Sequence, residues 1–500
     1  MVTWVEVVVL VVLFLAASGR GAVRDDIVLK HCDLTRYPER CRQVLMGFNE
    51  TNLVVDERRD QANSAVAVLS ALLRRTISET NNLPSSHFTV LDSGLEISQA
   101  RRAQAASEYC KELTGMSLQR LNQSLSALQN SPTKRKHDIQ TWLSSVLTFH
   151  EACADSIRHH SLSAADVASD HISGKMNYLS QLTSNALSLA NRITSTDKKS
   201  RGHVAGFPQW VSMKNRKLLQ GGGGGGGVRA DAVVAKDGTG NYETISAAIA
   251  AASGRSRFVI YVKAGIYEEK IRTNKDEITL VGDGKYATVI VGGDSVNGGS
   301  TMPGSATFTI TGDGFIARDI GFQNTAGPGG EQAVALYAAS DRSVFYRCSI
   351  TGHQDTLYAL ALRQFYRECD VSGTIDFIFG NAAAVFQSCS LLLRRPRPGN
   401  SVVVFANGRT DPGQTTGFSL QASRISAGGW AEWPGQGSYS KTLYFGEFSN
   451  SGPGAGTSGR VRWAGFHVMG PQEAAKFTVA NFIAGSSWLP STGVTFVAGL

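Results

Sequence analysis

The spacing of hydrophobic residues divides the chain into two halves. Between residues 25 and 200, apolar side chains recur every three or four positions, which is the spacing of one helical face. Glycine is scarce there, and short polar breaks separate the apolar stretches. The pattern predicts an all-α domain over 25–200, built as an antiparallel four-helix bundle. Two of the stripes are Leu118, Leu121, Leu125 and Leu128, and Ile139, Trp142, Leu143, Val146, Phe149 and Cys153.

From Val228 the pattern changes to short Val, Ile, Phe and Tyr runs that alternate with Gly, Asn, Asp and Ser turns. Phe258–Val262 and Ile278–Val281 are examples, and no long helical stretch separates such runs, which argues against a βαβ sheet. One pattern recurs at intervals of 21 and 20 residues, with its cysteine at Cys348, Cys369 and Cys389. A period near 20 fits one coil of a β-solenoid. Residues 228–500 are therefore predicted to form an all-β domain, a parallel β-helix.

The same period relates two carboxylates. Asp355, in Gly-His-Gln-Asp-Thr-Leu-Tyr, precedes Asp376, in Gly-Thr-Ile-Asp-Phe-Ile-Phe-Gly, by 21 residues. Since adjacent coils stack at about 4.8 Å, we expect the two carboxyl groups about 5 Å apart. Gln332 precedes Gln354 by 22 residues, which places it one coil earlier. The expected column is Gln332, then Gln354 with Asp355, then Asp376.

Such a column has the parts of an ester-hydrolysis site. Two neighbouring carboxyl groups split their pKa values, so one stays protonated while the other is anionic. The anion can attack an ester carbonyl, and the acid can protonate the departing alcohol. Glutamine amides can donate N–H groups to the oxyanion. No metal or other cofactor is required. The alternative is a structural ladder, because Asp is a common turn residue.

The N-terminus predicts a secretory route. The apolar run Val7–Ala17 is too short to span a bilayer and indicates a signal peptide over 1–22. An uncleaved anchor is the alternative, because no Lys or Arg precedes the run. Residues 201–227 read as a linker that ends in the glycine run Gly221–Gly227. A processing protease is expected to cut near Arg216–Leu219, unless the linker is never cut.

Composition and charge indicate which classes of binding partner to expect. The chain has 500 residues and a net charge of +8, enough for two or more domains. Its basic residues form no clustered stripe, so no nucleic-acid partner is expected. Asn49 and Asn122 lie in glycosylation sequons.

Seven cysteines fall into two groups. A secretory route permits disulfides, and the first four cysteines can pair among themselves. Cys348 and Cys369 are predicted to be stacked neighbours that bridge if their side chains face alike. The first group is Cys32, Cys41, Cys110 and Cys153, and the second is Cys348, Cys369 and Cys389.

Several motifs resemble those of plant pectinesterases that carry an N-terminal inhibitor-like domain. In the second half they are Val234–Gly238, Val281–Gly284, Gly314–Ile320, Asn324–Pro328, Gln332–Leu336, Gln354–Tyr358, Asp376–Asn381 and Gly485–Gly493. In the first half they are the Tyr37-Pro38 pair and the four cysteines. The resemblance implies a right-handed parallel β-helix and the disulfides Cys32–Cys41 and Cys110–Cys153.

The resemblance also implies a function. The expected substrate is methyl-esterified homogalacturonan of the cell wall, which is hydrolysed to pectate and methanol. Asp376 would be the nucleophile and Asp355 the proton donor, with Gln354 and Gln332 stabilising the transition state. Thr307 and Gln332 match substrate-contacting positions. The protein would be a secreted monomer, with its own pro-domain as a candidate inhibitor in cis.

One segment departs from the family. The Leu-Gly-Arg-Pro-Trp motif, expected between Arg424-Ile425 and Ala427–Trp430, is absent, and Ser423 stands where many members have a cysteine. The alternative function is therefore a catalytically impaired or inactive pectin-binding paralogue. A third hypothesis, a polysaccharide hydrolase, is disfavoured because inverting enzymes need carboxylates about 6.5–9.5 Å apart.

Overall fold

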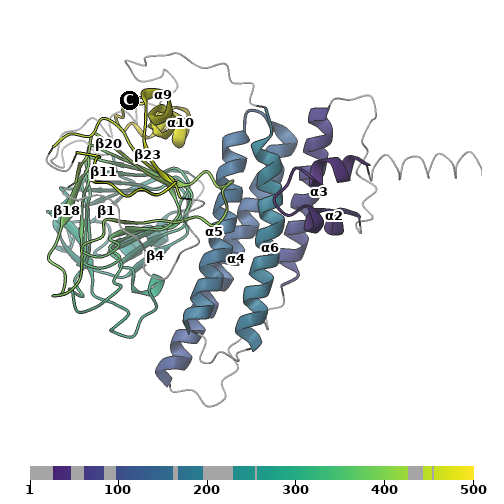
Figure 1. Cartoon of the computed structure of the whole chain (residues 1–500). Helices are drawn as coiled ribbons and strands as arrows, with labels where there is room; N and C mark the ends of the chain where they lie inside the picture. The colour runs from purple at the N-terminus through teal and green to yellow at the C-terminus, as the bar shows by residue number, and fades with distance from the viewer. Residues whose placement is uncertain are drawn as a thin grey trace, which may run out of the picture. The chain divides into compact units, whose positions relative to one another are not determined.

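The computed structural model describes residues 26–46, 61–83, 97–160, 167–194, 229–253, 256–425, 443–452 and 455–500. The chain separates into two compact units, one of long helices and one dominated by β-strands (Figure 1). The predicted signal peptide, Asn49, the linker with its processing site, and the position of the missing motif lie outside the described residues.

Within its described residues, the helical unit contains four long helices, as the apolar stripes predicted. The second stripe is fully buried, from Ile139 at 0% exposure to Cys153 at 1%. Its disulfides are Cys32–Cys41 and Cys110–Cys153, which confirms both pairings. Asn122 is exposed on its helix. The helices are α2 (Pro38–Met46), α3 (Gln61–Asn81), α4 (Ile97–Asn130), α5 (Lys136–His160) and α6 (Val167–Asn191). Among the described residues, none of the helices has both the length and the apolar character to cross a bilayer.

The second unit is a parallel β-helix, in which three sheets run along the coils and every pairing between strands is parallel. The eight-stranded sheet holds β1 (Ala232–Val234), β2 (Phe258–Val262), β5 (Ile278–Gly282), β8 (Ile316–Arg318), β11 (Ser343–Tyr346), β14 (Arg363–Arg367), β17 (Ala383–Gln387) and β20 (Gly417–Gln421). The seven-stranded sheet holds β3 (Gly265–Glu268), β6 (Thr288–Gly292), β9 (Gly321–Asn324), β12 (Ser349–Thr351), β15 (Asp370–Gly373), β18 (Ser390–Leu393) and β21 (Arg424–Ile425).

The six-stranded sheet bears the candidate site at one end of its strands. It holds β4 (Ile271–Thr273), β7 (Phe308–Ile310), β10 (Leu336–Ala338), β13 (Leu357–Ala359), β16 (Ile378–Phe379) and β19 (Phe405–Ala406). Outside these sheets, the described part of this unit has the strands β22 (Phe445–Glu447) and β23 (Phe466–Val468), and the α-helices α8 (Ile245–Ala251), α9 (Pro471–Ala474), α10 (Val479–Phe482) and α11 (Leu489–Thr492).

The predicted repeat is the core of the β-helix. Phe345 pairs with Tyr366, and Tyr366 with Phe386, on three successive strands. Their rings stack with centroids 4.8 and 4.5 Å apart. All three side chains are fully buried. The 20–21-residue period therefore corresponds to one coil, and equivalent residues stack on one another.

The cysteines of the repeat correct one prediction. Cys348 and Cys369 are free, buried thiols and not a disulfide. In-register parallel coils keep equivalent Cβ atoms about 4.8 Å apart with parallel bonds, whereas a disulfide needs about 3.8 Å. The thiols donate to backbone carbonyls instead: Cys369 to Phe345 at 3.2 Å and Cys389 to Tyr366 at 3.5 Å. Ser423 continues this column, and its hydroxyl donates to Phe386 at 3.1 Å.

Candidate active site

The two aspartates occupy equivalent positions on adjacent coils. Leu357 of β13 pairs with Ile378 of β16, and Asp355 and Asp376 each lie two residues before these partners. Both are in the turn that leads from the seven-stranded to the six-stranded sheet. Gln332 forms a parallel bridge with Gln354, so it lies one coil earlier. The structure therefore has the column that the spacing predicted.

Backbone contacts between coils hold this turn. The amide of Asp355 donates to the carbonyl of Ile375 at 3.0 Å, and the amide of Thr374 to that of His353 at 2.9 Å. Asp355 and Asp376 both have left-handed backbone, with φ of 60° and 49°. Asp adopts this region more readily than most residues because its short polar side chain tolerates it. The similar backbone geometry on successive coils places the two aspartates at the same position of the turn.

Gly373 allows the turn to approach its neighbours closely. A Cβ atom added there would lie 2.2 Å from the Cβ of Phe377 and 2.7 Å from the carbonyl oxygen of His353. Only glycine fits this space without moving the segment that bears Asp376.

Burial raises the pKa values of the two carboxyl groups by different amounts. Burial first, and the charge of Asp376 second, raise the pKa of Asp355 well above its usual value. Burial alone raises the pKa of Asp376 to about 6. Asp355, which is 8% exposed, is therefore the group that keeps its proton, and Asp376 ionises first. No cation among the described residues lowers the pKa of Asp376.

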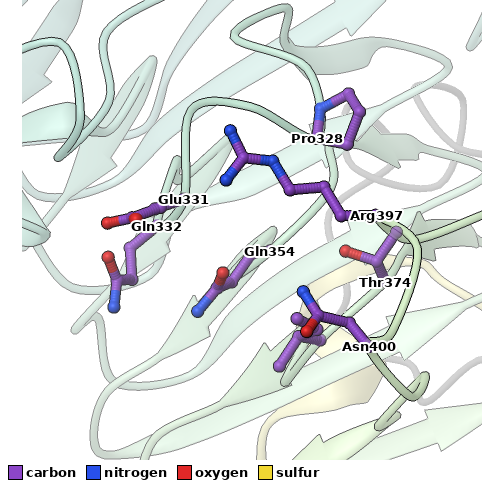
Figure 2. A pocket seen from close by; sticks show the side chains of 8 residues that line it. Pro328, Glu331, Gln332, Gln354, Thr374, Arg397 and Asn400 are labelled. Carbon is purple, nitrogen blue, oxygen red and sulfur yellow. The ribbon is translucent and has the colours of Figure 1, made fainter.

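A pocket of about 230 Å³ is lined by residues that adjoin the two aspartates in the sequence, although the aspartates themselves do not line it (Figure 2). Gln332 and Gln354 line it, and Ile375 connects it to Asp376 along the chain. The side-chain oxygen of Gln332 is buried and has no partner in the described part of the chain, so it can accept a hydrogen bond from a ligand. The full lining is Pro328, Glu331, Gln332, Gln354, Thr374, Ile375, Arg397 and Asn400.

Several lining residues were not predicted from the sequence. Thr374 lies one coil after His353 and could have been found by the period, whereas Arg397 and Asn400 come from the irregular loop after β18. Thr307 was predicted to contact substrate, but it is 2% exposed and its hydroxyl donates to the carbonyl of Gln323 at 3.0 Å. It is not among the residues that line this pocket.

The site offers carboxyl and amide groups and no assembled metal ligands. Within the described ranges, no three His, Cys, Asp or Glu side chains gather in a way that would hold a metal ion. His353 is half-buried, and burial followed by the charge of Arg394 lowers its pKa, so it is neutral near pH 7. The arrangement can supply one anionic carboxylate, one protonated carboxyl and two amide groups on adjacent coils.

Comparison with known families agrees with both units. Residues 231–428 and 425–486 match the family described as pectinesterase, and residues 26–189 match the plant invertase/pectin methylesterase inhibitor family. The two pectinesterase segments meet where the Leu-Gly-Arg-Pro-Trp motif is missing.

Similar proteins cover nearly the whole chain. A probable pectinesterase/pectinesterase inhibitor 17 of Arabidopsis thaliana is 43% identical over 98% of both chains. Pectinesterase 2 of Citrus sinensis is 39% identical over 99% of both. The solved structure of a pectin methylesterase from carrot is 43% identical, with a TM-score of 0.53, and covers 55% of this chain and 99% of its own.

These relatives favour an ester hydrolase over the pectin-binding alternative and over the polysaccharide hydrolase. Their similarity extends through both units, and the parallel coils agree with the carrot structure. The chain therefore belongs to the pectinesterase family and is a carboxylic ester hydrolase whose N-terminal domain belongs to the plant invertase/pectin methylesterase inhibitor family.

Proposed function

We propose that Asp376 is the nucleophile and Asp355 the acid and base in hydrolysis of homogalacturonan methyl esters to pectate and methanol. The observation that supports this assignment is the pair of aspartates at equivalent positions on adjacent coils, with separated pKa values. The group with the lower pKa ionises and attacks, and the group with the higher pKa donates the proton.

In the first half-reaction, the carboxylate of Asp376 bonds to the carbonyl carbon of the ester. The amide N–H groups of Gln332 and Gln354 donate to the oxyanion that forms. Collapse breaks the bond to the methoxy oxygen, which takes the proton of Asp355 and leaves as methanol. The product of this step is a covalent acyl-enzyme on Asp376.

In the second half-reaction, a water molecule gives its proton to the Asp355 carboxylate and bonds to the acyl carbon. Collapse releases the free galacturonate and restores the Asp376 carboxylate. Asp355 regains the proton that it gave to methanol, so the site returns to its starting state without any cofactor.

Methanol release by the secreted full chain tests these roles. Asp376→Ala and Asp355→Asn should each reduce the rate by at least about a hundredfold, the contribution of such groups in other enzymes. Asp237→Asn is the matched control, because Asp237 is exposed in a turn near the start of the β-helix. A variant without Asp376 that releases methanol at the wild-type rate would refute the assignment.

We further propose the cellular setting. A signal peptide over 1–22 would direct the chain to the cell wall, and a protease would separate the pro-domain, 25–200, from the catalytic domain, 228–500, by cutting near Arg216–Leu219. The catalytic domain would act as a monomer, and the pro-domain would inhibit it in cis. N-terminal sequencing of the secreted protein tests the two cleavages, and adding back the isolated pro-domain tests inhibition.

A further inference from the structure

An arginine directly after β18 contacts both turns of the candidate site. The backbone amide of Arg394 donates to the carbonyl of Gly373 at 2.8 Å, at the start of the turn that bears Asp376. Its guanidinium donates to the carbonyl of Gly352 at 2.8 Å, at the start of the turn that bears Asp355. Because the three residues lie on three successive coils, the side chain of Arg394 spans the middle coil.

The carbonyl of Gly352 lies where the hydrogen-bond ladder between the coils changes. The amide of Gly352 donates to Ser372 at 3.1 Å, and a regular parallel ladder would continue with the amide of Thr374 donating to the Gly352 carbonyl. Thr374 donates to His353 instead, at 2.9 Å. Gly352 is buried, and a buried carbonyl without a donor is costly. Arg394 therefore supplies the donor that the turn itself does not.

An ion pair does not explain the position of Arg394. Its charge has no carboxylate partner among the residues that the structure describes. Its side chain is half-buried and is not among those that line the pocket. A ligand in the pocket therefore meets other side chains, and any effect of Arg394 on the reaction has to pass through the turn that it holds.

The pocket residue nearest to this contact in the sequence is Gln354, two positions after Gly352. Gln354 lines the pocket (Figure 2), and its side-chain amide forms no hydrogen bond within the described part of the chain. Its position therefore depends on the backbone of the turn. The amide of Ala333 holds this backbone from the preceding coil, by donating to the carbonyl of Gln354 at 3.2 Å. Arg394 holds it from the side of the following coils.

We propose that Arg394 is a positioning residue, which holds the carbonyl of Gly352 so that the amide of Gln354 can donate to the oxyanion. The backbone of Arg394 is bonded to Gly373, on the coil of Asp376, so the contact also fixes Gln354 relative to the nucleophile. Arg394 touches neither the substrate nor the reacting atoms. The inference rests on the proposed function for the role of Gln354.

Kinetics of the secreted full chain test this role. Arg394→Met removes the donor and keeps an apolar side chain over the coil. Its kcat for methanol release should fall by about 10- to 100-fold, the cost of a displaced catalytic group, while its KM stays within about twofold of the wild type. Arg395→Met, at the exposed next residue, is the matched control and should keep both constants. A wild-type kcat in Arg394→Met, or a change in KM alone, overturns the inference.

A double-mutant cycle shows whether the effect passes through Gln354. In a Gln354→Ala background, Arg394→Met should lower kcat by a much smaller factor than in the wild type, because the group that it positions is gone. Equal factors in the two backgrounds would mean a general structural role and refute the proposal. If Arg394→Met does not fold, Arg394→Lys, which keeps a cation with a shorter reach, takes its place in the cycle, and the same two outcomes decide.

Hydrogen exchange separates this inference from the proposed chemistry, because it requires no turnover. Backbone amides between residues 351 and 358 should exchange about tenfold faster in Arg394→Met than in Arg395→Met, the effect of losing one hydrogen bond to a charged group. If the wild type releases no methanol but the two variants show this difference, the catalytic assignment fails and the role of Arg394 in holding the turn stands. Equal exchange in the two variants refutes that role.

Discussion

At the scale of single residues, the site depends on how burial divides two identical side chains. Asp355 and Asp376 have the same chemistry and the same backbone conformation, yet Asp355 is more deeply buried and also feels the charge of Asp376. Both pKa values are raised, and the unequal rise assigns their roles. In the proposed reaction, position in the stack, and not residue type, therefore decides which aspartate donates and which attacks.

The pKa of Asp376 predicts an acid limb in the pH–rate profile. Because this pKa is about 6, the proposed nucleophile is mostly protonated below pH 6 and ionised above it. Methanol release should fall about tenfold per pH unit below that value and level off above it, while Asp355 keeps its proton. Initial rates from pH 4 to 8 measure this limb. A rate that stays flat down to pH 4 would mean that a cation outside the described residues lowers the pKa of Asp376.

At the scale of elements, the turn between β15 and β16 is shaped by close contacts. Gly373→Ala should destabilise the β-helix by about 1–3 kcal/mol, the usual cost of overpacking, because its Cβ would meet Phe377 and His353. The same shift would displace Asp376. The rate of methanol release should therefore fall by more than the loss of folded protein accounts for. Gly408→Ala is the control, since nothing lies within 4 Å of its added Cβ. Equal activity in both variants would contradict this account of the turn.

The cysteine column makes a prediction about reactivity. Burial raises the pKa values of Cys369 and Cys389 well above the usual thiol range, so they have almost no thiolate at neutral pH. In the native protein, an aromatic disulfide reagent should therefore label none of the column's thiols, and it should label all three after denaturation without reductant. Labelling of a single thiol after denaturation would indicate a bridge between the other two.

At the scale of the whole molecule, each compact unit has its own means of stabilisation. The β-helix relies on its stacked interior and has no disulfide among the described residues, whereas the helical unit has two. The Cys110–Cys153 bridge joins α4 to α5 across 43 residues, and Cys32–Cys41 spans only nine. The longer loop restricts the unfolded chain more.

Removal of each bridge should therefore have different effects. Loop-entropy arguments give a loss of about 4 kcal/mol for Cys110→Ser with Cys153→Ser, against about 2.5 kcal/mol for Cys32→Ser with Cys41→Ser. Calorimetry of the full chain should show the helical transition lowered more by the first pair, with the β-helix transition unchanged. A larger effect from the shorter loop would contradict the loop-length argument.

The sequence by itself determined the structural features that repeat at a fixed interval along the chain. Apolar periodicity identified the long helices, and the 20–21-residue period predicted the coil and the column of Gln332, Gln354, Asp355 and Asp376. These features are predictable because each depends on contacts between equivalent positions, which the chain repeats at a fixed interval.

Only the tertiary structure decided the rest. It left Cys348 and Cys369 as thiols, because in-register stacking holds their Cβ atoms too far apart, and it buried the side chain of Thr307. It brought Arg397 from an irregular loop to the pocket beside Gln332. Contacts of this kind join segments with no common period, so they follow from how the loops pack against the coils and not from any pattern along the chain.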